Sequence, residues 1–353
     1  MQHVDLVVIG SGQGGVPLAV DFAKAGKQVV LFERGTWGGS CLNYGCTPSK
    51  MFLASAHQAA AARNADRLGV HADVTVDFPA VMSRVRETVL DWTAASHERL
   101  TDAGVRAIEA EAAFVGPRQV KGGGIEVEAE TVVINTGKSP FVPDIDGEPG
   151  LRATPHLTYK SFWHLARLPA VTLVLGAGFV GLELGQGLAR LGSEVHFIER
   201  ADRPIPRVTP DISEILKDAL TADGAFLHLG ATVAQVDHDR DTRTFTVHLE
   251  SGETLEGQAL LVSAGRRSNT AALNASAGEV ALDDHGNVVV DEHLRTSCEG
   301  VYAIGDVTGQ PAFTHVSWED YRRIKAILDG EARTQMDRVL GYSLFTEPQV
   351  AQA

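Results

Sequence analysis

The same local pattern occurs twice in this chain, and it restricts the possible folds more than any other feature of the sequence. Each copy has a short apolar run, a glycine-rich turn, a helical stretch and a second apolar run that ends in glutamate. Such an order of strand, turn, helix and strand predicts a parallel α/β unit at each place. The copies span residues 4–33 and 171–199, and their turns carry Gly10, Gly12 and Gly15 in the first and Gly176, Gly178 and Gly181 in the second.

The closing glutamates, Glu33 and Glu199, give this pattern a chemical meaning. In a dinucleotide-binding unit the glycines let the backbone approach the pyrophosphate, the helix amino end stabilises its charge, and the carboxylate accepts from a ribose hydroxyl. One glycine pattern alone is a weak signal, so the strand and helix context carries the prediction of two dinucleotide sites. Two such cofactors in one protein indicate that electrons pass from one to the other.

A pair of cysteines, Cys41 and Cys46, follows the first unit. Asn43 and Gly45 permit a sharp turn between them, which would let the two sulfurs form a small disulfide ring. Pro48 suits the first turn of a helix, so Cys46 would sit at a helix amino end, where a thiolate is stabilised. From the spacing alone, a redox-active pair and an inert staple or two buried thiols are equally well supported. No metal site is predicted, because no second pair of ligands with suitable spacing follows.

Composition places the chain among globular proteins of two or three domains, since 353 residues of which 44% are hydrophobic can bury substantial cores. The formal net charge of −14 argues against nucleic acid or an anionic membrane as partner. We expect the cytoplasm, because Met1 leads into a strand without a hydrophobic leader and no apolar run is long enough to span a bilayer. Three cysteines make a redox-active bridge more plausible than a structural one, and Cys298 is expected to be buried and inert.

The expected fold class is α/β, with two Rossmann-like three-layer domains of which the second is inserted into the first. Prolines and glycines cluster in residues 140–150 at the first boundary, and a glycine exit at Gly265 closes the inserted domain near Asn269. Short alternating strands in residues 105–133 are typical of a small antiparallel excursion. A helix over residues 78–103 carries a stripe that we expect to face the core, formed by Val81, Val85, Val89, Trp92 and Leu100.

Several segments together resemble the pyridine nucleotide-disulfide reductases, especially the mercuric reductases and dihydrolipoamide dehydrogenases. These segments are the stretch from Cys41 to Lys50, the two glycine turns, the strand exits at Thr136-Gly137 and Gly265-Arg266, and the stretch from Ala303 to Asp306. The resemblance implies FAD at the first turn and NAD(P)H at the second. It also implies an FAD domain in residues 1–149 and 270–340, an NAD(P) domain in residues 150–269, and the start of an interface domain in residues 341–353.

The resemblance further implies roles for single residues. Cys46 would face the flavin, and Cys41 would meet the substrate. Lys50 would lie near the flavin and pair with Glu183, which gives a buried lysine a partner and places a cation beside the reduced flavin. Asp306 would hold the ribityl chain, and Thr314 would lie beneath the pyrimidine end. Further cofactor contacts are expected from Gly10, Gly12, Gly15, Glu33, Arg34, Gly39, Ser40, Ala112, Thr136, Gly137, Gly176, Gly178, Phe179, Gly181, Glu199, Arg200, Gly265 and Arg266.

Three details leave alternatives open. Phe179 stands where several members of the family place an aromatic lid over the nicotinamide, and a core phenylalanine is an equally good interpretation. His315 stands where many members have proline, and a structural histidine is favoured over a catalytic one. Glu199 favours the free 2'-hydroxyl of NADH, which is our prediction, although three arginines follow it within reach: Arg200, Arg203 and Arg207.

The sequence thus predicts a flavoenzyme that passes electrons from NAD(P)H through FAD to a Cys41-Cys46 disulfide, and on to a disulfide, a thiol-bound metal ion such as Hg(II), or another small acceptor. In the family the interface domain forms a homodimer and supplies a histidine and a glutamate as an acid-base pair. This chain shows only the resemblance of residues 342–350 to the opening strand of that domain. We therefore expect the full-length form to be a homodimer, whereas this chain could also be a monomer. We also expect this chain to turn over a disulfide substrate poorly. The alternatives are a diaphorase or NAD(P)H oxidase with an idle disulfide, and a non-catalytic nucleotide-binding fragment.

Overall fold

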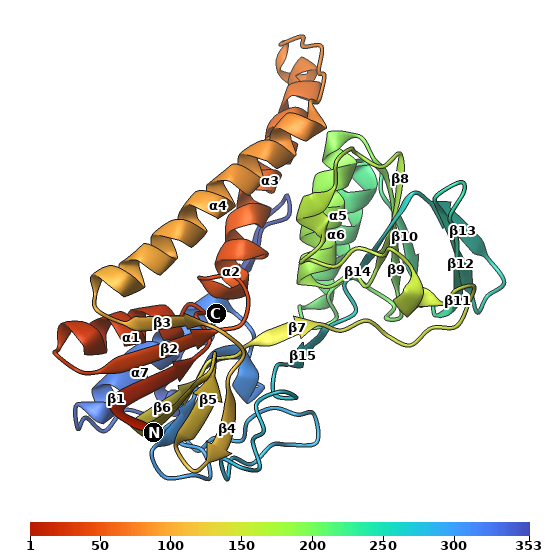
Figure 1. The fold of residues 1–353 in the computed structure, drawn as a ribbon. Helices are drawn as coiled ribbons and strands as arrows, with labels where there is room; N and C mark the ends of the chain where they lie inside the picture. The colour runs from red at the N-terminus through yellow and green to blue at the C-terminus, as the bar shows by residue number, and fades with distance from the viewer.

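The computed structural model describes residues 1–353 and contains two parallel sheets that follow the same strand order. In each sheet the first strand of the unit lies between the second and the last, which leaves the glycine turn at the point where the strand order reverses. The first sheet has the order β3-β2-β1-β6 and lies at the lower left of Figure 1. Its elements are β1 (Gln2–Ile9), α1 (Gly15–Lys24), β2 (Val29–Glu33), β3 (Arg106–Glu109) and β6 (Ile125–Ile134).

Strand β6 is long enough to belong to two arrangements. Its first half pairs antiparallel with β5 (Gln119–Gly122), which pairs in turn with β4 (Ala113–Gly116). On its other side β6 pairs parallel with β1 along almost its whole length, from Val127 to Ile134. On the β5 side, its last residues pair parallel with β16 (Val301–Ala303). The predicted antiparallel excursion is therefore present, and it extends the same sheet.

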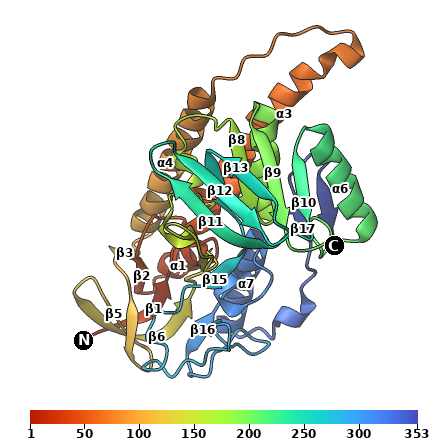
Figure 2. The same ribbon diagram turned by 90° about the vertical axis from the view of Figure 1, so that its right-hand side faces the viewer.

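The second sheet has the order β10-β9-β8-β14 and lies at the right of Figure 1. A separate antiparallel sheet, β11-β12-β13, packs beside it and faces the viewer in Figure 2. The predicted α/β class is confirmed, since both glycine units form parallel sheets with helices against them. The elements are β8 (Val171–Leu175), α5 (Phe179–Leu191), β9 (Glu194–Glu199), α6 (Pro210–Ala222), β10 (Phe226–Leu229), β11 (Val233–Asp239), β12 (Thr244–Leu249), β13 (Thr254–Gly257) and β14 (Ala259–Val262).

Two short antiparallel strands, β7 (Lys138–Pro140) and β15 (Arg266–Ser268), carry the chain out to the second sheet and back. Figure 1 shows them as the bridge between the two halves. Short 3₁₀ helices follow on the way out, η2 (Leu151–Ala153) and η3 (Phe162–His164). After the return the chain forms η4 (Gly305–Thr308), α7 (Thr314–Leu328), η5 (Gln335–Asp337) and the hairpin of β17 (Tyr342–Leu344) and β18 (Val350–Gln352).

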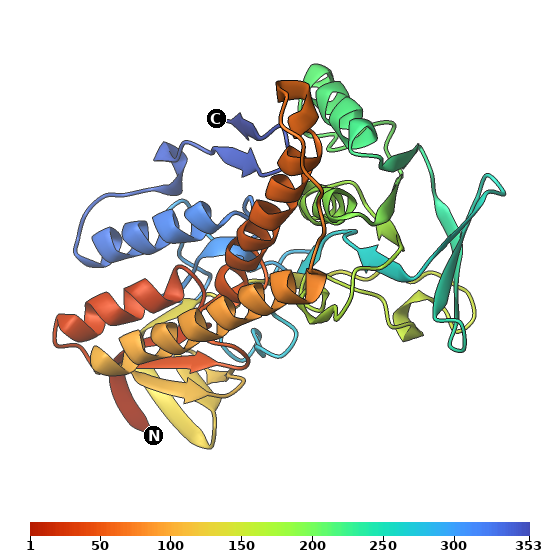
Figure 3. The same ribbon diagram turned by 90° about the horizontal axis from the view of Figure 1, so that it is seen from above.

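A pair of long helices joins the two halves. Helix α3 (Cys46–Arg63) follows the short α2 (Gly39–Asn43), and α4 (Phe78–Asp102) returns beside it after η1 (Ala65–Leu68). Seen from above in Figure 3, α3 crosses toward the helices of the second sheet. Phe52 of α3 packs so closely on α5 that a Cβ on Gly187 would stand 2.3 Å from its ring. One continuous core cluster therefore spans α3, α4, α5 and the second sheet, and also includes Leu344.

The predicted stripe of α4 is only partly correct. Val85 and Leu100 are fully buried, whereas Trp92 is 54% exposed. Trp92 and Trp318 both line a groove formed by residues of α1, α4 and α7. Neither α4 nor any other helix combines the length and apolar character that a membrane crossing requires.

Candidate active site

A cavity of about 770 Å³ runs from the first glycine turn to the two cysteines. Its volume is within the range of about 300–1,000 Å³ that is usual for cofactor and ligand sites. Most of the predicted residues of the first site form its wall: Gly10, Gly12, Glu33, Arg34, Gly39, Ser40, Cys41, Cys46, Lys50, Ala112, Thr136, Gly137, Phe179, Glu183, Arg266, Asp306 and Thr314.

The remaining predicted residues do not line this cavity. Gly15 lies under the first turn, where an added Cβ would stand 2.3 Å from the carbonyl oxygen of Gly10, so its role is packing. The others belong to the second glycine unit or to the return strand: Gly176, Gly178, Gly181, Glu199, Arg200 and Gly265. The structure thus brings together the predicted contacts of the first nucleotide. Of those predicted for the second, only Phe179 lines the same cavity.

Glu33 is held at the end of β2 by the backbone of the first turn. Its carboxylate accepts from the backbone N–H and the hydroxyl of Ser11, at 2.9 Å and 2.6 Å, and from the N–H of Gly35 at 2.9 Å. These donors fix the carboxylate beside the turn, at the wall of the cavity. A fixed carboxylate at this place can accept hydrogen bonds from a ribose.

The two cysteines both line the cavity, and their sulfurs are not bonded to each other in this structure. Cys46 is the first residue of α3, as predicted, and its sulfur lies 3.0 Å from the hydroxyl of Thr314. A hydrogen bond from the Cys41 thiol, with Thr314 and the Lys50 ammonium nearby, lowers the pKa of Cys46. The same hydrogen bond and burial raise the pKa of Cys41. Of the two thiols, Cys46 is therefore the one that loses its proton more readily.

Lys50 and Glu183 form an ion pair across the two halves of the molecule. The Lys50 ammonium lies 2.8 Å and 3.0 Å from the two carboxylate oxygens of Glu183, whose side chain is only 10% exposed. The ammonium also lies 4.2 Å from the centre of the Phe345 ring, within cation–π distance. The predicted pairing is thus present in the structure, one helix turn from Cys46.

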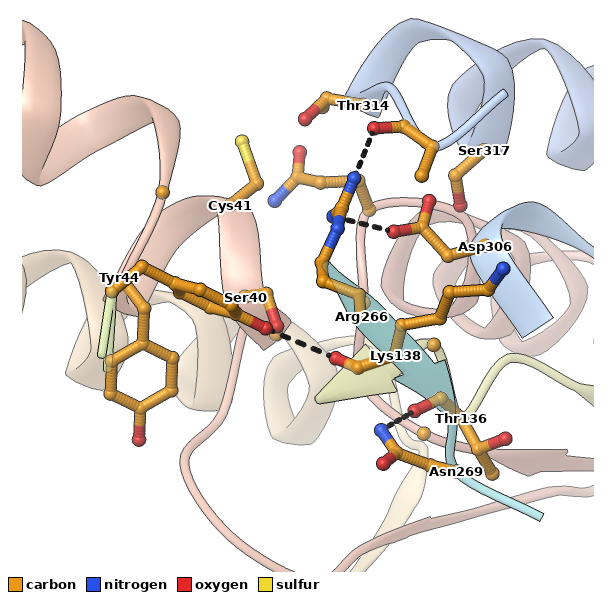
Figure 4. Close-up of a pocket in the computed structure, with 18 of the residues that line it drawn as sticks. Ser40, Cys41, Tyr44, Thr136, Lys138, Arg266, Asn269, Asp306, Thr314 and Ser317 are labelled. Atoms are coloured by element: carbon orange, nitrogen blue, oxygen red, sulfur yellow. Dashed lines mark hydrogen bonds and ion pairs between the residues drawn. The ribbon is translucent and has the colours of Figure 1, made fainter. Parts of the chain in front are cut away.

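A second ion pair, between Arg266 and Asp306, lies in the wall of the cavity. Arg266 donates to Asp306 at 3.0 Å and to the carbonyl of Ala312 at 3.0 Å. Figure 4 shows Asp306 between Arg266 and Lys138, with Thr314 and Ser317 on the neighbouring helix α7. Burial is the main cause that raises the pKa of Asp306, and Arg266 and Lys138 oppose it. Two residues that the sequence assigned separately, Arg266 and Asp306, therefore act as one unit.

Phe179 belongs to an aromatic cluster at the mouth of the cavity. Its ring lies 5.6 Å from that of Phe313 and 5.4 Å from that of Tyr342, both edge to face. His315 stacks on Phe313 at 5.6 Å and also lines the cavity. In this structure Phe179 packs against other side chains, and it also borders the space leading to the thiols.

Several residues of the wall were not found from the sequence. Lys138 directly follows the predicted Gly137, so its position was the one available signal. Tyr159, Lys160 and Trp163 come from the segment leading to the second sheet, and no motif marks them. Tyr159 donates to the carbonyl of Lys138, and Trp163 to that of Tyr44, which ties this segment to the first half.

One buried polar atom in the wall has no partner within the protein. The hydroxyl of Thr136 is buried and makes no hydrogen bond, although Thr136 lines the cavity at the end of β6. The backbone carbonyl of the same residue accepts from Asn269 at 2.8 Å, as Figure 4 shows. A buried hydroxyl without a partner is uncommon, and a polar ligand in the cavity would satisfy it.

Comparison with known proteins agrees with this geometry. Residues 4–320 match the family described as pyridine nucleotide-disulphide oxidoreductase. The chain is 32% identical to a mercuric reductase of Bacillus cereus over 98% of its own length and 55% of that protein. It is also 32% identical to the probable pyridine nucleotide-disulfide oxidoreductase RclA of Escherichia coli (strain K12), covering 77% of it, and to a dihydrolipoyl dehydrogenase of Halobacterium salinarum, covering 74%.

Solved structures show the same likeness. The Cu(II) complex of the HOCl-induced flavoprotein disulfide reductase RclA from Escherichia coli matches with a TM-score of 0.90 at 32% identity, over 99% of this chain and 77% of that one. The chain thus spans between about half and three quarters of the length of these relatives. The family match covers both glycine units, the cysteine segment and the return to the first sheet, so the chain belongs to the pyridine nucleotide-disulphide oxidoreductase family.

Proposed function

We propose that the chain is a flavin-dependent NAD(P)H oxidoreductase that reduces a Cys41-Cys46 disulfide and passes the electrons to a small acceptor. One observation carries this proposal: a single cavity joins the first glycine turn to a thiol pair, beside an ion pair formed by Lys50 from one half and Glu183 from the other. A hydride from NAD(P)H and one proton balance the reduction of the disulfide to two thiols. The dithiol then passes two electrons to the acceptor and becomes a disulfide again. Its two protons go to the product when the acceptor is a disulfide and to water when the acceptor is a metal ion.

The cavity residues fit FAD as the group of the first site. The N–H groups of the first turn would bind the diphosphate at the amino end of α1, Glu33 would accept from the ribose, and the free hydroxyl of Thr136 would gain a partner. Asp306, held by Arg266, would accept from the ribityl hydroxyls. When bound, FAD supplies the two-electron step between the hydride donor and the thiols.

The two cysteines are proposed to differ in role because their surroundings differ. Cys46 carries the thiolate at the amino end of α3, so it is the thiol that faces the flavin. Cys41 is the thiol proposed to exchange with the acceptor, which is the role that the family resemblance implies for it. Lys50 would stabilise negative charge on the reduced cofactor, in the role that a fixed cation has at many sites of developing charge.

NADH is the proposed electron donor at the second site. The carboxylate of Glu199 accepts from the N–H groups of Ala177 and Ala201, at 2.8 Å and 3.0 Å. A carboxylate fixed in this way suits a free ribose hydroxyl and repels a 2'-phosphate. Of the arginines that follow, Arg203 donates to the carbonyl of Pro206 and Arg207 lines the cavity, which supports roles other than binding a phosphate.

A disulfide or a thiol-bound metal ion is the proposed class of acceptor. Mercuric reductases are among the relatives, and one related structure is a Cu(II) complex. Thiolates prefer soft metal ions, and Hg(II) is such an ion. The family resemblance supports a homodimer as the assembly. The small number of cysteines supports the cytoplasm as the compartment.

Anaerobic titration with NADH tests the proposal. We expect the yellow protein to develop a long-wavelength absorbance band from the Cys46 thiolate beside the oxidised flavin, and Cys46→Ala to abolish it. Cys41→Ser is the matched control, because it should keep the band but lose turnover with the acceptor. A chain without bound flavin, or a band that persists in Cys46→Ala, would contradict the assignment. Unchanged turnover in Cys41→Ser would favour a diaphorase or oxidase with an idle disulfide.

A further inference from the structure

Helix α5 carries three polar side chains whose contacts reach beyond the ion pair with Lys50. Glu183, Gln186 and Arg190 follow one another along one face of this helix, since they are three and four residues apart. Gln186 is fully buried. Buried side-chain amides are nearly always hydrogen-bonded. The amide of Gln186 bonds to the backbone of Glu347 and to Asp223.

The amide of Gln186 holds the backbone of Glu347 at two points. Its oxygen accepts from the N–H of Glu347 at 2.8 Å, and its nitrogen donates to the carbonyl of Glu347 at 2.8 Å. The nitrogen also donates to Asp223 at 2.7 Å, and Asp223 accepts from Arg190 at 2.7 Å. Because each of these contacts fixes the amide plane, Gln186 clamps residue 347 to α5 in one orientation.

Phe345, two residues before Glu347, contacts the Lys50–Glu183 ion pair. The N–H of Phe345 donates at 3.0 Å to the same Glu183 oxygen that accepts from Lys50 at 3.0 Å. The Phe345 ring lies on the ammonium of Lys50, and Leu344 next to it is buried in the core. The position of the Lys50 ammonium therefore depends on where residues 345–347 lie.

We propose that Gln186 is a positioning residue for Lys50, acting through the backbone of Glu347 and Phe345. With the segment clamped, the Phe345 N–H and ring hold the Glu183 carboxylate and the Lys50 ammonium at the thiol end of the cavity. The inference rests on the proposed function for the roles of Lys50 and Cys46. A purely structural glutamine would stabilise α5 without changing the charge beside Cys46.

The test is a double-mutant cycle that reads the reactivity of Cys46. Gln186→Met keeps the length of the side chain and removes all three of its hydrogen bonds. We expect the prereduced, anaerobic chain to be alkylated by iodoacetamide at Cys46 about threefold more slowly at pH 6 than the wild type. In a Lys50→Met background the same substitution should have no effect. Site-resolved mass spectrometry separates Cys46 from Cys41.

The matched control is Gln258→Met, which removes a side-chain acceptor from the N–H of Val171 in the inserted half and should leave Cys46 alkylation unchanged. Equal slowing with and without Lys50, or no slowing, would overturn the proposal. If Gln186→Met does not fold, Phe345→Leu carries the same cycle, since it removes the ring from the ammonium. A chain that binds no flavin would refute the proposed function alone, because alkylation requires neither cofactor nor acceptor.

Discussion

The two glycine turns have the same local structure and different surroundings. In both, the closing glutamate accepts from the residue after the first glycine and from the residue two positions after itself: Ser11 and Gly35 for Glu33, Ala177 and Ala201 for Glu199. In both, the third glycine lies against the carbonyl of the first, where a Cβ would stand 2.3 Å or 2.1 Å away. Similar sequences therefore fold into the same nucleotide-binding turn twice.

The surroundings of the second glycine separate the two turns. A Cβ on Gly12 would meet the side chain of Asn135 at 2.9 Å, whereas a Cβ on Gly178 would have nothing within 4 Å. The first turn packs against Asn135 after β6, Ser317 of α7 and Gly39 of α2, whereas the second glycine of the other turn has open space on its Cβ side. This difference fits the proposed function, in which FAD stays bound at the first turn and NADH exchanges at the second.

The largest difference between the two turns is expected when the second glycine of each, Gly12 or Gly178, is replaced by alanine and cofactor binding is measured. Gly12→Ala has to displace the Asn135 side chain and adds a methyl group to the turn that the diphosphate would approach, so we expect about a hundredfold weaker flavin binding, or about 2–3 kcal/mol. Gly178→Ala has room and should keep the flavin, with a small loss of NADH affinity. Flavin fluorescence on titration of the flavin-free protein measures the first, and NADH titration the second. Equal flavin loss in both variants would end the distinction.

The Lys50–Glu183 ion pair, which joins the two halves, should contribute more to the free energy of unfolding than an ion pair within one half. Glu183→Gln leaves Lys50 without its partner, and because Lys50 is one-third exposed the expected loss of unfolding free energy is about 1–2 kcal/mol. Glu111→Gln is the control, since it breaks an exposed pair with Arg34 worth less than about 0.5 kcal/mol. Chemical denaturation compares the two variants. A Glu111→Gln variant that is the less stable of the two would contradict this ranking.

The next prediction tests whether the Glu199 carboxylate at the second turn makes the protein prefer NADH over NADPH. Glu199→Gln should weaken NADH binding about fivefold, because a charged acceptor for the ribose becomes neutral. NADPH binding should improve, since the repulsion of its 2'-phosphate is relieved. Stopped-flow reduction at several coenzyme concentrations gives both values. Loss of both coenzymes to the same extent would show that Glu199 only supports the turn.

The last prediction concerns how the alkylation rate of Cys46 in the unsubstituted protein depends on pH. A thiol whose pKa is lowered carries its thiolate at a pH below the ordinary thiol range of about 8.5. The alkylation rate should therefore stay high through neutral pH and fall only as the pH drops through the lowered pKa. Lys50→Met should move this fall to higher pH. A profile centred near the ordinary thiol value would show that Cys46 holds no stabilised thiolate.

The sequence predicted local features well where neighbours along the chain decide them. The start of α3 at Cys46 follows from Gly45 and Pro48, and both glycine turns fold as predicted. The role of Trp92 as a core residue was wrong, because periodicity identifies one face of a helix and not whether another element covers it. Tyr159 and Trp163 were missed, since the segment that carries them meets the cavity only after the chain has crossed between the halves.

By itself, the sequence determined the two nucleotide-binding turns, their glutamates and the helix that begins at Cys46, because hydrogen bonds within about 25 residues build each of them. Only the tertiary structure decided that one turn is enclosed and the other open, that Arg266 neutralises Asp306, and that residues 345–347 lie on Glu183 and Gln186. Those contacts join residues 40 to 162 positions apart. Their geometry depends on how the two halves pack, which no local pattern records.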